Sequence, residues 1–181
     1  MEGYFDMMAR QQAAEIATIA PRTLTLNLSE ADTERIALHA AKAGMTVGQL
    51  LESFIGDLVG GTYSNGSDER DYADRWYERC GFTYMATSDV AILAKWDSLD
   101  TMVDYCESYK AAVEELAYFQ EEIGKDEDIT EEDIKNAQEW VAESRADVER
   151  LMKDAKCTGT LEAVMKEVLQ WKADLDAFKG A

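Results

Sequence analysis

The chain contains a single proline, Pro21, among its 181 residues. An average proline content of about 5% would give roughly nine. Because proline breaks helix interiors, its near absence leaves the residues after Pro21 free to form long helices. The residue before a proline avoids the helical region, so a weak N-terminal helix over residues 1–20 is expected to end at Pro21.

Beyond residue 98, apolar side chains recur at the heptad spacing of helices that pack along one stripe. Gly124 and Gly159 interrupt this pattern and divide it into three stretches. Three amphipathic helices with short connectors are expected to form an antiparallel bundle over residues 99–181, with the stripes as its core. The stripe residues are Leu99, Met102, Cys106, Tyr109, Val113, Leu116 and Ile123; Ile134, Ala137, Val141, Val148, Leu151 and Ala155; and Leu161, Val164, Val168, Trp171, Leu175 and Phe178.

The segment just after Pro21 follows a different period. Residues 22–28, RTLTLNL, alternate strictly between polar and apolar side chains. A period of two predicts a half-buried β-strand with Leu24, Leu26 and Leu28 on its inner face. Because a lone strand cannot satisfy its backbone hydrogen bonds, the prediction requires a second strand from a partner, and another copy of the chain is the simplest donor.

Two short helices are predicted directly after the strand. Ser29 is a typical N-cap and Gly44 a typical residue after a helix C-terminus, and together they bound the first helix. Thr46 and Gln49 form a capping-box pattern at the start of the second helix. The residues that follow at the spacing of one helix face are Val47, Leu50, Leu51, Phe54, Ile55 and Leu58.

The order RTLTLNLS, EADTERIALHAAKAGM and TVGQLLESFIGDL resembles the ribbon-helix-helix family. In that family two chains pair their strands into an antiparallel ribbon that enters the DNA major groove, and the helices form an interlocked dimer core. The DNA-binding residues that the resemblance implies are Arg22, Thr23, Thr25 and Asn27 on the ribbon, with Thr46 and Val47 at a helix N-terminus that holds a phosphate. The dimerisation residues it implies are Leu24, Leu26, Leu28, Leu50 and Phe54.

A short charged helix is predicted over residues 67–80, after a break rich in glycine and serine. Its arginines Arg70, Arg75 and Arg79 stand near aromatic residues, a combination that can contact nucleic acid. These three arginines are therefore candidate partner-binding residues. Acidic neighbours at i, i+4 spacing favour the alternative interpretation, a salt-bridged surface helix.

The sequence as a whole predicts a mainly α-helical protein in three parts. A ribbon-helix-helix-like head, whose single strand forms an intermolecular antiparallel ribbon, occupies residues 1–60 with its core at 22–58. Connecting helices follow over 61–98, and the acidic antiparallel helical bundle over 99–181.

The charge of the chain bears on the choice of partner. It carries 37 acidic and 18 basic residues, a net charge of −19, of which −15 falls in residues 61–181. Proteins that bind DNA gain affinity when lysine and arginine neutralise phosphates, so this polyanion is expected to bind DNA poorly. Its acidic surface instead complements a protein that normally holds nucleic acid, although solubility alone would also explain the composition.

The overall layout is similar to that of anti-CRISPR proteins from phages of gut bacteria. The features that support this likeness are the head, the segment SNGSDERDYADRWYERCGF and the acidic bundle. The likeness implies a homodimer that inhibits a Cas9-type nuclease, or another nucleic-acid-binding protein, by occupying its basic channel, with double-stranded DNA as a further ligand. The alternative is a transcriptional regulator or antitoxin whose head binds an operator.

No combination of residues indicates catalysis, so we expect no enzyme, no cofactor and no metal. His39 is the only histidine, and a Ser-His-Asp triad or most zinc sites would have to use it. Glu131, Glu132 and Asp133 could assist metal-dependent hydrolysis. They also fall in the first turn of a predicted helix, where the helix dipole favours acids without any catalytic role.

The cysteines and the apolar runs indicate where the chain resides. Cys80, Cys106 and Cys157 form no CxxC pair, which is typical of reduced thiols. No apolar run approaches the ~20 residues that cross a bilayer. The N-terminal residues MEGYFD are acidic where a signal peptide is basic. We therefore expect a protein of the bacterial host cytoplasm that contacts no membrane.

Overall fold

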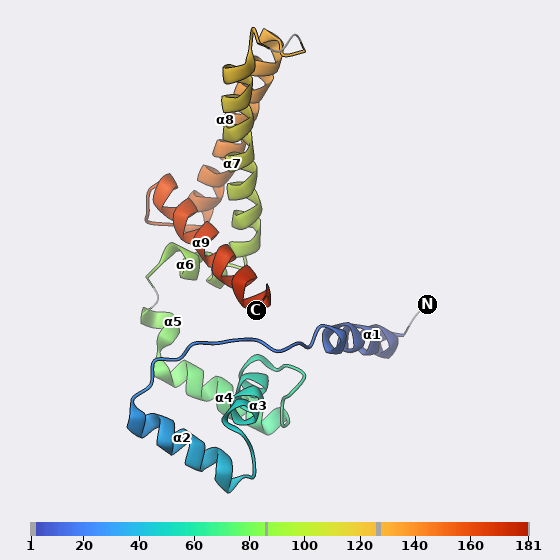
Figure 1. The fold of residues 1–181 in the computed structure, drawn as a ribbon, viewed down its shortest axis with the longest axis vertical. Helices are drawn as coiled ribbons and strands as arrows, with labels where there is room; N and C mark the ends of the chain where they lie inside the picture. Colours follow the sequence, from blue (N-terminus) through green and yellow to red (C-terminus); the bar gives the residue numbers. More distant parts are fainter. Residues whose placement is uncertain (1–2, 86, 126–127, 181) are drawn as a thin grey trace. The chain divides into compact units, whose positions relative to one another are not determined.

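The computed structural model describes residues 3–85, 87–125 and 128–180 (Figure 1). The chain divides into two compact units, residues 1–85 and 86–180, called here the N-terminal and C-terminal units. The N-terminal unit contains α1 (Tyr4–Ala17), α2 (Glu30–Lys42), α3 (Val47–Val59), α4 (Ser67–Cys80) and α5 (Phe82–Met85). The C-terminal unit contains α6 (Asp89–Lys95), α7 (Leu99–Glu122), α8 (Glu131–Ala155) and α9 (Leu161–Gly180). The prediction of a mainly α-helical fold is thus confirmed.

The segment over residues 61–98, predicted to hold connecting helices, is shared between the two units. It contributes α4 and α5 to the N-terminal unit and α6 to the C-terminal unit. No sequence pattern predicted α6. Its seven residues are too few to show a helical period of apolar side chains.

The helices α2 and α3 begin at the predicted capping residues. The Ser29 hydroxyl oxygen accepts a hydrogen bond from the Asp32 backbone N–H at 3.1 Å. At the start of α3, the Thr46 hydroxyl oxygen accepts from the Gln49 N–H at 3.1 Å, and the Thr46 N–H donates to the Gln49 side chain at 2.9 Å. This reciprocal pair is the capping box that the sequence pattern predicted.

The prediction of a β-strand over residues 22–28 is wrong. None of the described residues forms a strand, and residues 19–29 connect α1 to α2 without regular secondary structure. Leu24, Leu26 and Leu28 are 59%, 49% and 52% exposed, so they do not form the inner face of a sheet. The physical reason is that a strand requires a neighbour for its backbone N–H and C=O groups, and the described part of the chain offers no such neighbour.

The connection after α3 folds back onto that helix at Gly56. The Gly61 N–H donates to the Gly56 carbonyl oxygen at 2.8 Å. A Cβ atom at residue 56 would lie only 2.6 Å from the backbone carbonyl carbon of Tyr63. Position 56 therefore accommodates only glycine unless the backbone moves.

Asp57 holds the end of the same connection. The Asn65 backbone N–H donates to Oδ1 of Asp57 at 2.6 Å, and the Asn65 side-chain amide donates to Oδ2 at 2.8 Å. The side-chain bond first and the backbone bond second lower the pKa of Asp57 below its ordinary value of 3.8. This anchor is consequently intact above the unfolded-state pKa of the carboxyl group and weakens as the pH falls through the lowered value.

The C-terminal unit is built on a long antiparallel hairpin of α7 and α8 (Figure 1). These helices have 24 and 25 residues, yet no helix in the described ranges is long and apolar enough to cross a membrane. α6 and α9 pack at the end of the hairpin where α7 begins and α8 ends, and one apolar core forms there. The buried core residues are Leu93, Leu99, Met102, Val103, Cys106, Val148, Ala155, Leu161, Val164 and Val168.

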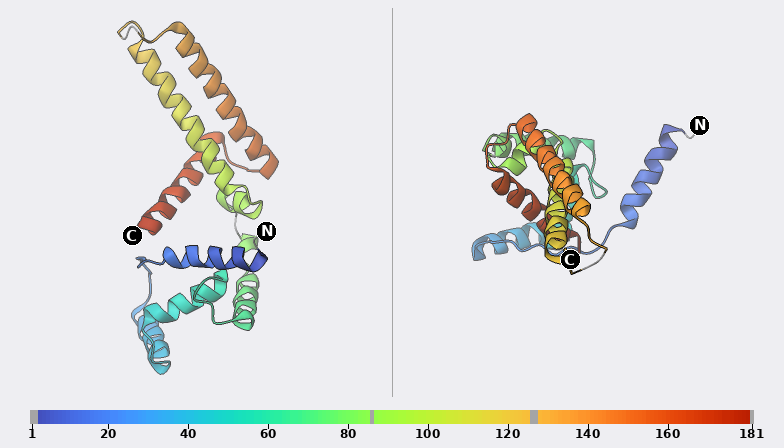
Figure 2. Two further views of the ribbon diagram at one scale, coloured as in Figure 1. Left: turned by 90° about the vertical axis from the view of Figure 1, so that its right-hand side faces the viewer. Right: turned by 90° about the horizontal axis from the view of Figure 1, so that it is seen from above.

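The C-terminal unit is bundle-like, as predicted, but a third long helix accompanies the α7–α8 hairpin at that end only. α9 packs against α6 and α7 and then leaves the hairpin, so that the far half of α7 and α8 has no third helix beside it (Figure 2). The predicted stripes change accordingly: Met102 and Val164 are fully buried, whereas Val113 is 42% exposed. In the far half, the small residues Ala112 and Ala137 are buried instead.

A buried carboxylate fixes α6 to the connection between α8 and α9. Asp89 is 7% exposed, and its two oxygens accept hydrogen bonds from the backbone N–H groups of Thr158 at 2.7 Å and Gly159 at 2.9 Å. In return, Glu167 of α9 accepts from the backbone N–H groups of Asp89 at 3.1 Å and Val90 at 3.4 Å. The Glu167 carboxylate lies at the N-terminus of α6, where the helix dipole favours a negative charge. Together these hydrogen bonds hold α6 against the start of α9 and the connection before it.

The three free cysteines occupy different environments. Burial, with a smaller contribution from the charge of Glu107, raises the pKa of Cys106 to about 11. Burial and then the charge of Asp89 raise the pKa of the half-buried Cys157. Cys80 is exposed at the end of α4.

This arrangement predicts a strict order of thiol reactivity. With a water-soluble disulfide reagent at neutral pH, Cys80 is expected to react at least tenfold faster than Cys106, since the reactive species is an accessible thiolate. Mass spectrometry of peptides after timed labelling measures the order, with urea-unfolded protein as the control in which all three thiols react alike. Early modification of Cys106 in the folded protein would contradict its placement in the core.

Candidate functional site

The residues predicted to read DNA do not form a reading surface. Arg22, Thr23, Thr25 and Asn27 are exposed, but they lie in the irregular segment 19–29. Without a ribbon, nothing presents alternate side chains of this segment to a DNA groove. A role for these residues in DNA binding stays a prediction.

The start of α3, predicted to hold a phosphate, is partly satisfied by the chain itself. The capping box bonds the N–H groups of Thr46 and Gln49. The first turn of α3 carries no acidic residue, so no negative side chain there would repel an anion bound at Thr46 and Val47. Phosphate binding at this terminus stays a prediction as well.

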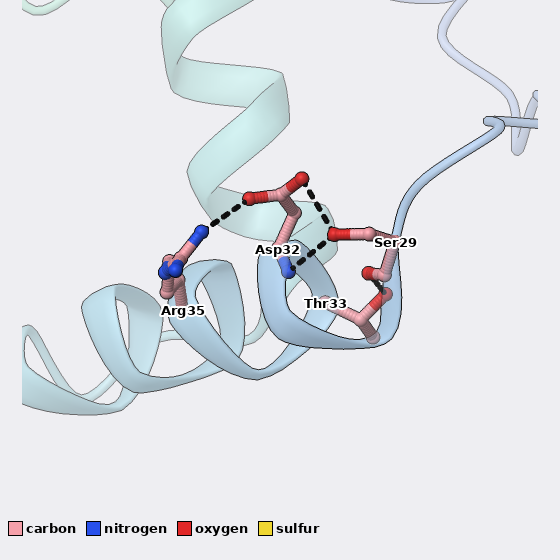
Figure 3. A network of polar contacts seen from close by, with 4 residues as sticks. All are labelled: Ser29, Asp32, Thr33 and Arg35. Atoms are coloured by element: carbon pink, nitrogen blue, oxygen red, sulfur yellow. Dashed lines mark hydrogen bonds and ion pairs between the residues drawn. The ribbon is translucent and has the colours of Figure 1, made fainter.

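The start of α2 is closed to anions. Figure 3 shows Asp32 between Ser29 and Arg35: the Ser29 hydroxyl donates to Asp32 at 2.7 Å, and the Arg35 guanidinium donates to the other carboxylate oxygen at 2.9 Å. The Thr33 hydroxyl donates to the Ser29 carbonyl oxygen at 3.0 Å. The carboxylate of Asp32 thus occupies the terminus and engages the nearest arginine.

The three candidate arginines of α4 are exposed. Arg75 pairs with Asp71 at 3.1 Å, as expected of a salt-bridged surface helix. Arg70 lies on the side of α4 that faces the Gly60 turn, and both line a shallow groove beside α1. Arg79 lies in the last turn of α4, where a positive charge complements the helix dipole. Partner binding by these arginines stays a prediction.

An aromatic cluster of four rings, Phe54, Trp76, Tyr77 and Phe82, joins α3, α4 and α5. Phe54 meets Trp76 edge-on with ring centroids 5.5 Å apart, and Trp76 meets Phe82 at 5.9 Å. Tyr77 lies 5.5 Å from Phe82. The family resemblance had placed Phe54 in a dimer interface, and no sequence pattern had singled out Phe82. Because these contacts join three helices, no single helical period could have revealed them.

The most concentrated charge lies at the far end of the α7–α8 hairpin. We define the acidic tip as residues 114–125 and 128–139, which contain nine acidic and two basic residues, a net charge of −7. Both lysines are engaged by acids of the tip itself, Lys125 with the half-buried Glu122 at 3.2 Å and Lys135 with the exposed Glu139 at 3.9 Å. The negative potential of the tip is therefore only slightly offset from within.

Apolar side chains accompany these acids. Val113, just before the tip, and Tyr118 and Ile123 within it are exposed. Thr130 hydrogen-bonds Asp133 and lowers the pKa of that carboxyl group, so Asp133 is a capping residue. The tip thus presents apolar side chains among its charges.

The residues that the sequence offered for chemistry were His39 and the acids at 131–133. The described residues contain no group of three or more histidine, cysteine, aspartate or glutamate side chains that could hold a metal ion. Glu131 and Glu132 are exposed in the first turn of α8, beside the capping residue Asp133. His39 is exposed in the last turn of α2. No nucleophile, base and oxyanion donor can be placed together from these residues.

Compared with protein family models, curated proteins and solved structures, the chain matches none of them. The resemblance to the ribbon-helix-helix family is wrong, because residues 22–28, where its strand was expected, are irregular, and the described residues form helices and no strand. The likeness to anti-CRISPR proteins depended on the same head, and no family model supports it.

Proposed function

We propose that the chain acts by binding a protein, and that this partner normally holds nucleic acid in a basic channel, as a Cas9-type nuclease does. The acidic tip is the surface that engages the partner. It competes there with nucleic acid and so inhibits the partner. The bacterial cytoplasm, where such nucleases act, is the proposed location.

The observation that carries this proposal is the placement of the charge. The tip concentrates a net charge of −7 in 24 residues of the hairpin half that α9 leaves uncovered. A projecting hairpin can enter a channel without unfolding the core on which it stands. Charges arranged in this way raise the rate of association with a basic surface and favour encounters in which the two proteins are correctly oriented.

The same charge argues against nucleic acid as the direct ligand. The phosphates of a nucleic acid repel a polyanion, and the few exposed arginines of α4 are interleaved with acids. A regulator that binds an operator was the alternative from the sequence. Its reading head depended on the missing ribbon, and no surface of the described residues favours it.

The direct test is target-DNA cleavage by Cas9–guide complexes from several divergent sources, with increasing amounts of the purified chain. Dose-dependent protection at physiological salt is expected for at least one nuclease. Because the attraction is electrostatic, protection should weaken as the salt concentration rises. If no nuclease is inhibited and none binds the chain, this class of partner is excluded.

Neutralising the tip is expected to weaken inhibition. The triple variant carries Glu115→Gln, Glu121→Gln and Glu132→Gln, three exposed tip acids outside the Thr130 cap. Its half-inhibitory concentration should rise about tenfold, mainly through slower association. Cleavage assays and surface-binding kinetics at two salt concentrations measure both effects.

A matched control removes the same charge elsewhere. Glu34→Gln, Glu143→Gln and Glu162→Gln are also exposed and lie outside the tip. This control should inhibit almost as strongly as the unmodified chain. Equal losses in the two triple variants would show that total charge, and not the tip, governs binding.

A further inference from the structure

The dipeptide Asn65-Gly66 ends the connection between α3 and α4, and the fold assigns a role to each of its residues. The backbone N–H and the side-chain amide of Asn65 both donate to Asp57, at 2.6 Å and 2.8 Å, and we call this pair of hydrogen bonds the Asp57 anchor. Gly66 is the N-cap of α4. The fold thus uses an amide side chain at residue 65 and the backbone conformation of residue 66.

The backbone at residue 66 requires glycine. Its φ is 154° and its ψ is −179°, a combination that essentially only glycine adopts. A Cβ atom at this position would also lie 2.9 Å from a side-chain oxygen of Glu69. The start of α4 therefore keeps a glycine directly after Asn65.

An asparagine followed by glycine is prone to lose its side-chain amide. Because glycine has no Cβ, its backbone nitrogen can approach the side-chain amide carbon of the residue before it. In this chain the Gly66 N–H donates to no acceptor among the described residues, so no hydrogen bond holds the attacking nitrogen in place. Asn65 itself is exposed, so water has access to the reacting groups.

The Asp57 anchor opposes this reaction. Ring closure requires rotation of both the backbone and the side chain of Asn65. One hydrogen bond of the anchor restrains the backbone and the other restrains the side chain. The reaction must therefore proceed through conformations in which the anchor has opened locally.

We propose that Asn65 is a site of spontaneous deamidation and that the Asp57 anchor sets its rate. The Gly66 nitrogen gives up its proton to the solvent and attacks the side-chain amide carbon of Asn65. The new C–N bond replaces the bond to the amide nitrogen, which takes up a proton and leaves as ammonia. Water then opens the cyclic imide to aspartate or isoaspartate. The reaction consumes water, releases ammonia and needs no oxidant or cofactor.

Deamidation changes the anchor from an attractive contact into a repulsive one. A carboxylate at residue 65 has no side-chain N–H to donate, and it places a like charge opposite Asp57. The connection, which also bonds α3 through the Gly61 N–H and the Gly56 carbonyl oxygen, is then expected to open. This change lies in the N-terminal unit and does not depend on the proposed inhibition by the acidic tip.

The test is peptide mass spectrometry of the full chain during incubation in warm neutral buffer. Asn65 should deamidate at least about tenfold faster than Asn27 and Asn136, the other two asparagines, which precede a leucine and an alanine. Asp57→Ala should accelerate the reaction about tenfold, toward the rate of the chain unfolded in guanidinium chloride, because the anchor no longer has to open.

Glu52→Ala is the matched control. It removes an exposed acid from the same helix, whereas the hydrogen bonds of Asn65 go to Asp57. This variant should deamidate at the rate of the unmodified chain. Equal rates in the Asp57 and Glu52 variants would overturn the role of the anchor. Deamidation of Asn27 or Asn136 as fast as that of Asn65 would overturn the assignment of the site.

The consequence of the reaction is tested on a mimic of its product. In Asn65→Asp the Gly61 amide should exchange its hydrogen at least about tenfold faster than in Asn65→Ala, which loses the side-chain amide but gains no charge. Hydrogen exchange followed by NMR measures both variants. Equal exchange rates would show that the new carboxylate does not release the connection.

Discussion

Asp89→Ala is expected to lower the free energy of unfolding of the C-terminal unit by about 3 kcal/mol. The substitution removes an acceptor from the backbone N–H groups of Thr158 and Gly159, at a site where water is largely excluded. Buried donors that lose their partner keep the whole cost of desolvation. Urea denaturation followed by tryptophan fluorescence measures the loss, since three of the four tryptophans belong to this unit.

The matched control for this substitution is Asp100→Ala in the first turn of α7. Asp100 is also an acid near a helix start, but it is exposed. Its replacement should change the unfolding free energy by about 0.5 kcal/mol at most. If Asp89→Ala cost no more than Asp100→Ala, the Asp89 carboxylate would not be the group that holds α6 to the α8–α9 connection.

Gly56→Ala is expected to destabilise the N-terminal unit by about 2–3 kcal/mol. The new Cβ would lie 2.6 Å from the Tyr63 carbonyl carbon and 2.8 Å from the Ser64 nitrogen, and backbone atoms cannot rotate away. The connection must then leave α3. Hydrogen exchange should show the Gly61 amide, which donates to the Gly56 carbonyl, losing its protection.

Gly48→Ala provides the control on the same helix. The nearest atom to a Cβ at residue 48 is the Thr46 hydroxyl oxygen at 3.7 Å, an ordinary contact distance. Alanine is a better helix former than glycine, so this variant should be more stable by about 0.5–1 kcal/mol. Opposite signs for one substitution at two positions of α3 would separate packing from helix propensity; loss of stability in both would contradict the placement of the connection.

The sequence located most helices because the signals for them are local. Ser29, Thr46 and Thr130 each cap the helix that follows within three residues, and the apolar stripes indicate the three long helices of the C-terminal unit. The acidic tip could likewise be found from the sequence, since its acids gather in one stretch of the chain. That the tip extends beyond the core of its unit could not be predicted, because this depends on where α9 packs.

The strand was predicted from an equally clear pattern and was wrong. Alternation at residues 22–28 describes which side chains could share a face, but a strand exists only with a hydrogen-bonded neighbour. The described residues provide none, and the leucines stay exposed. The residues of this segment that were predicted to bind DNA therefore have no ribbon that would present them to a groove.

The sequence by itself determined most of the helices, several of their caps, the apolar stripes and the amount of negative charge, because each depends on residues a few positions apart. Only the tertiary structure decided which parts of the stripes are buried, where α9 leaves the hairpin and how Asp89 reaches residues 158 and 159. These depend on contacts between residues about 70 positions apart in the chain, and many pairings of amphipathic helices satisfy the same local pattern. That the apolar stripe of α3 stays partly exposed is likewise a property of the packed unit, since the sequence of the stripe is the same as that expected of a buried helix.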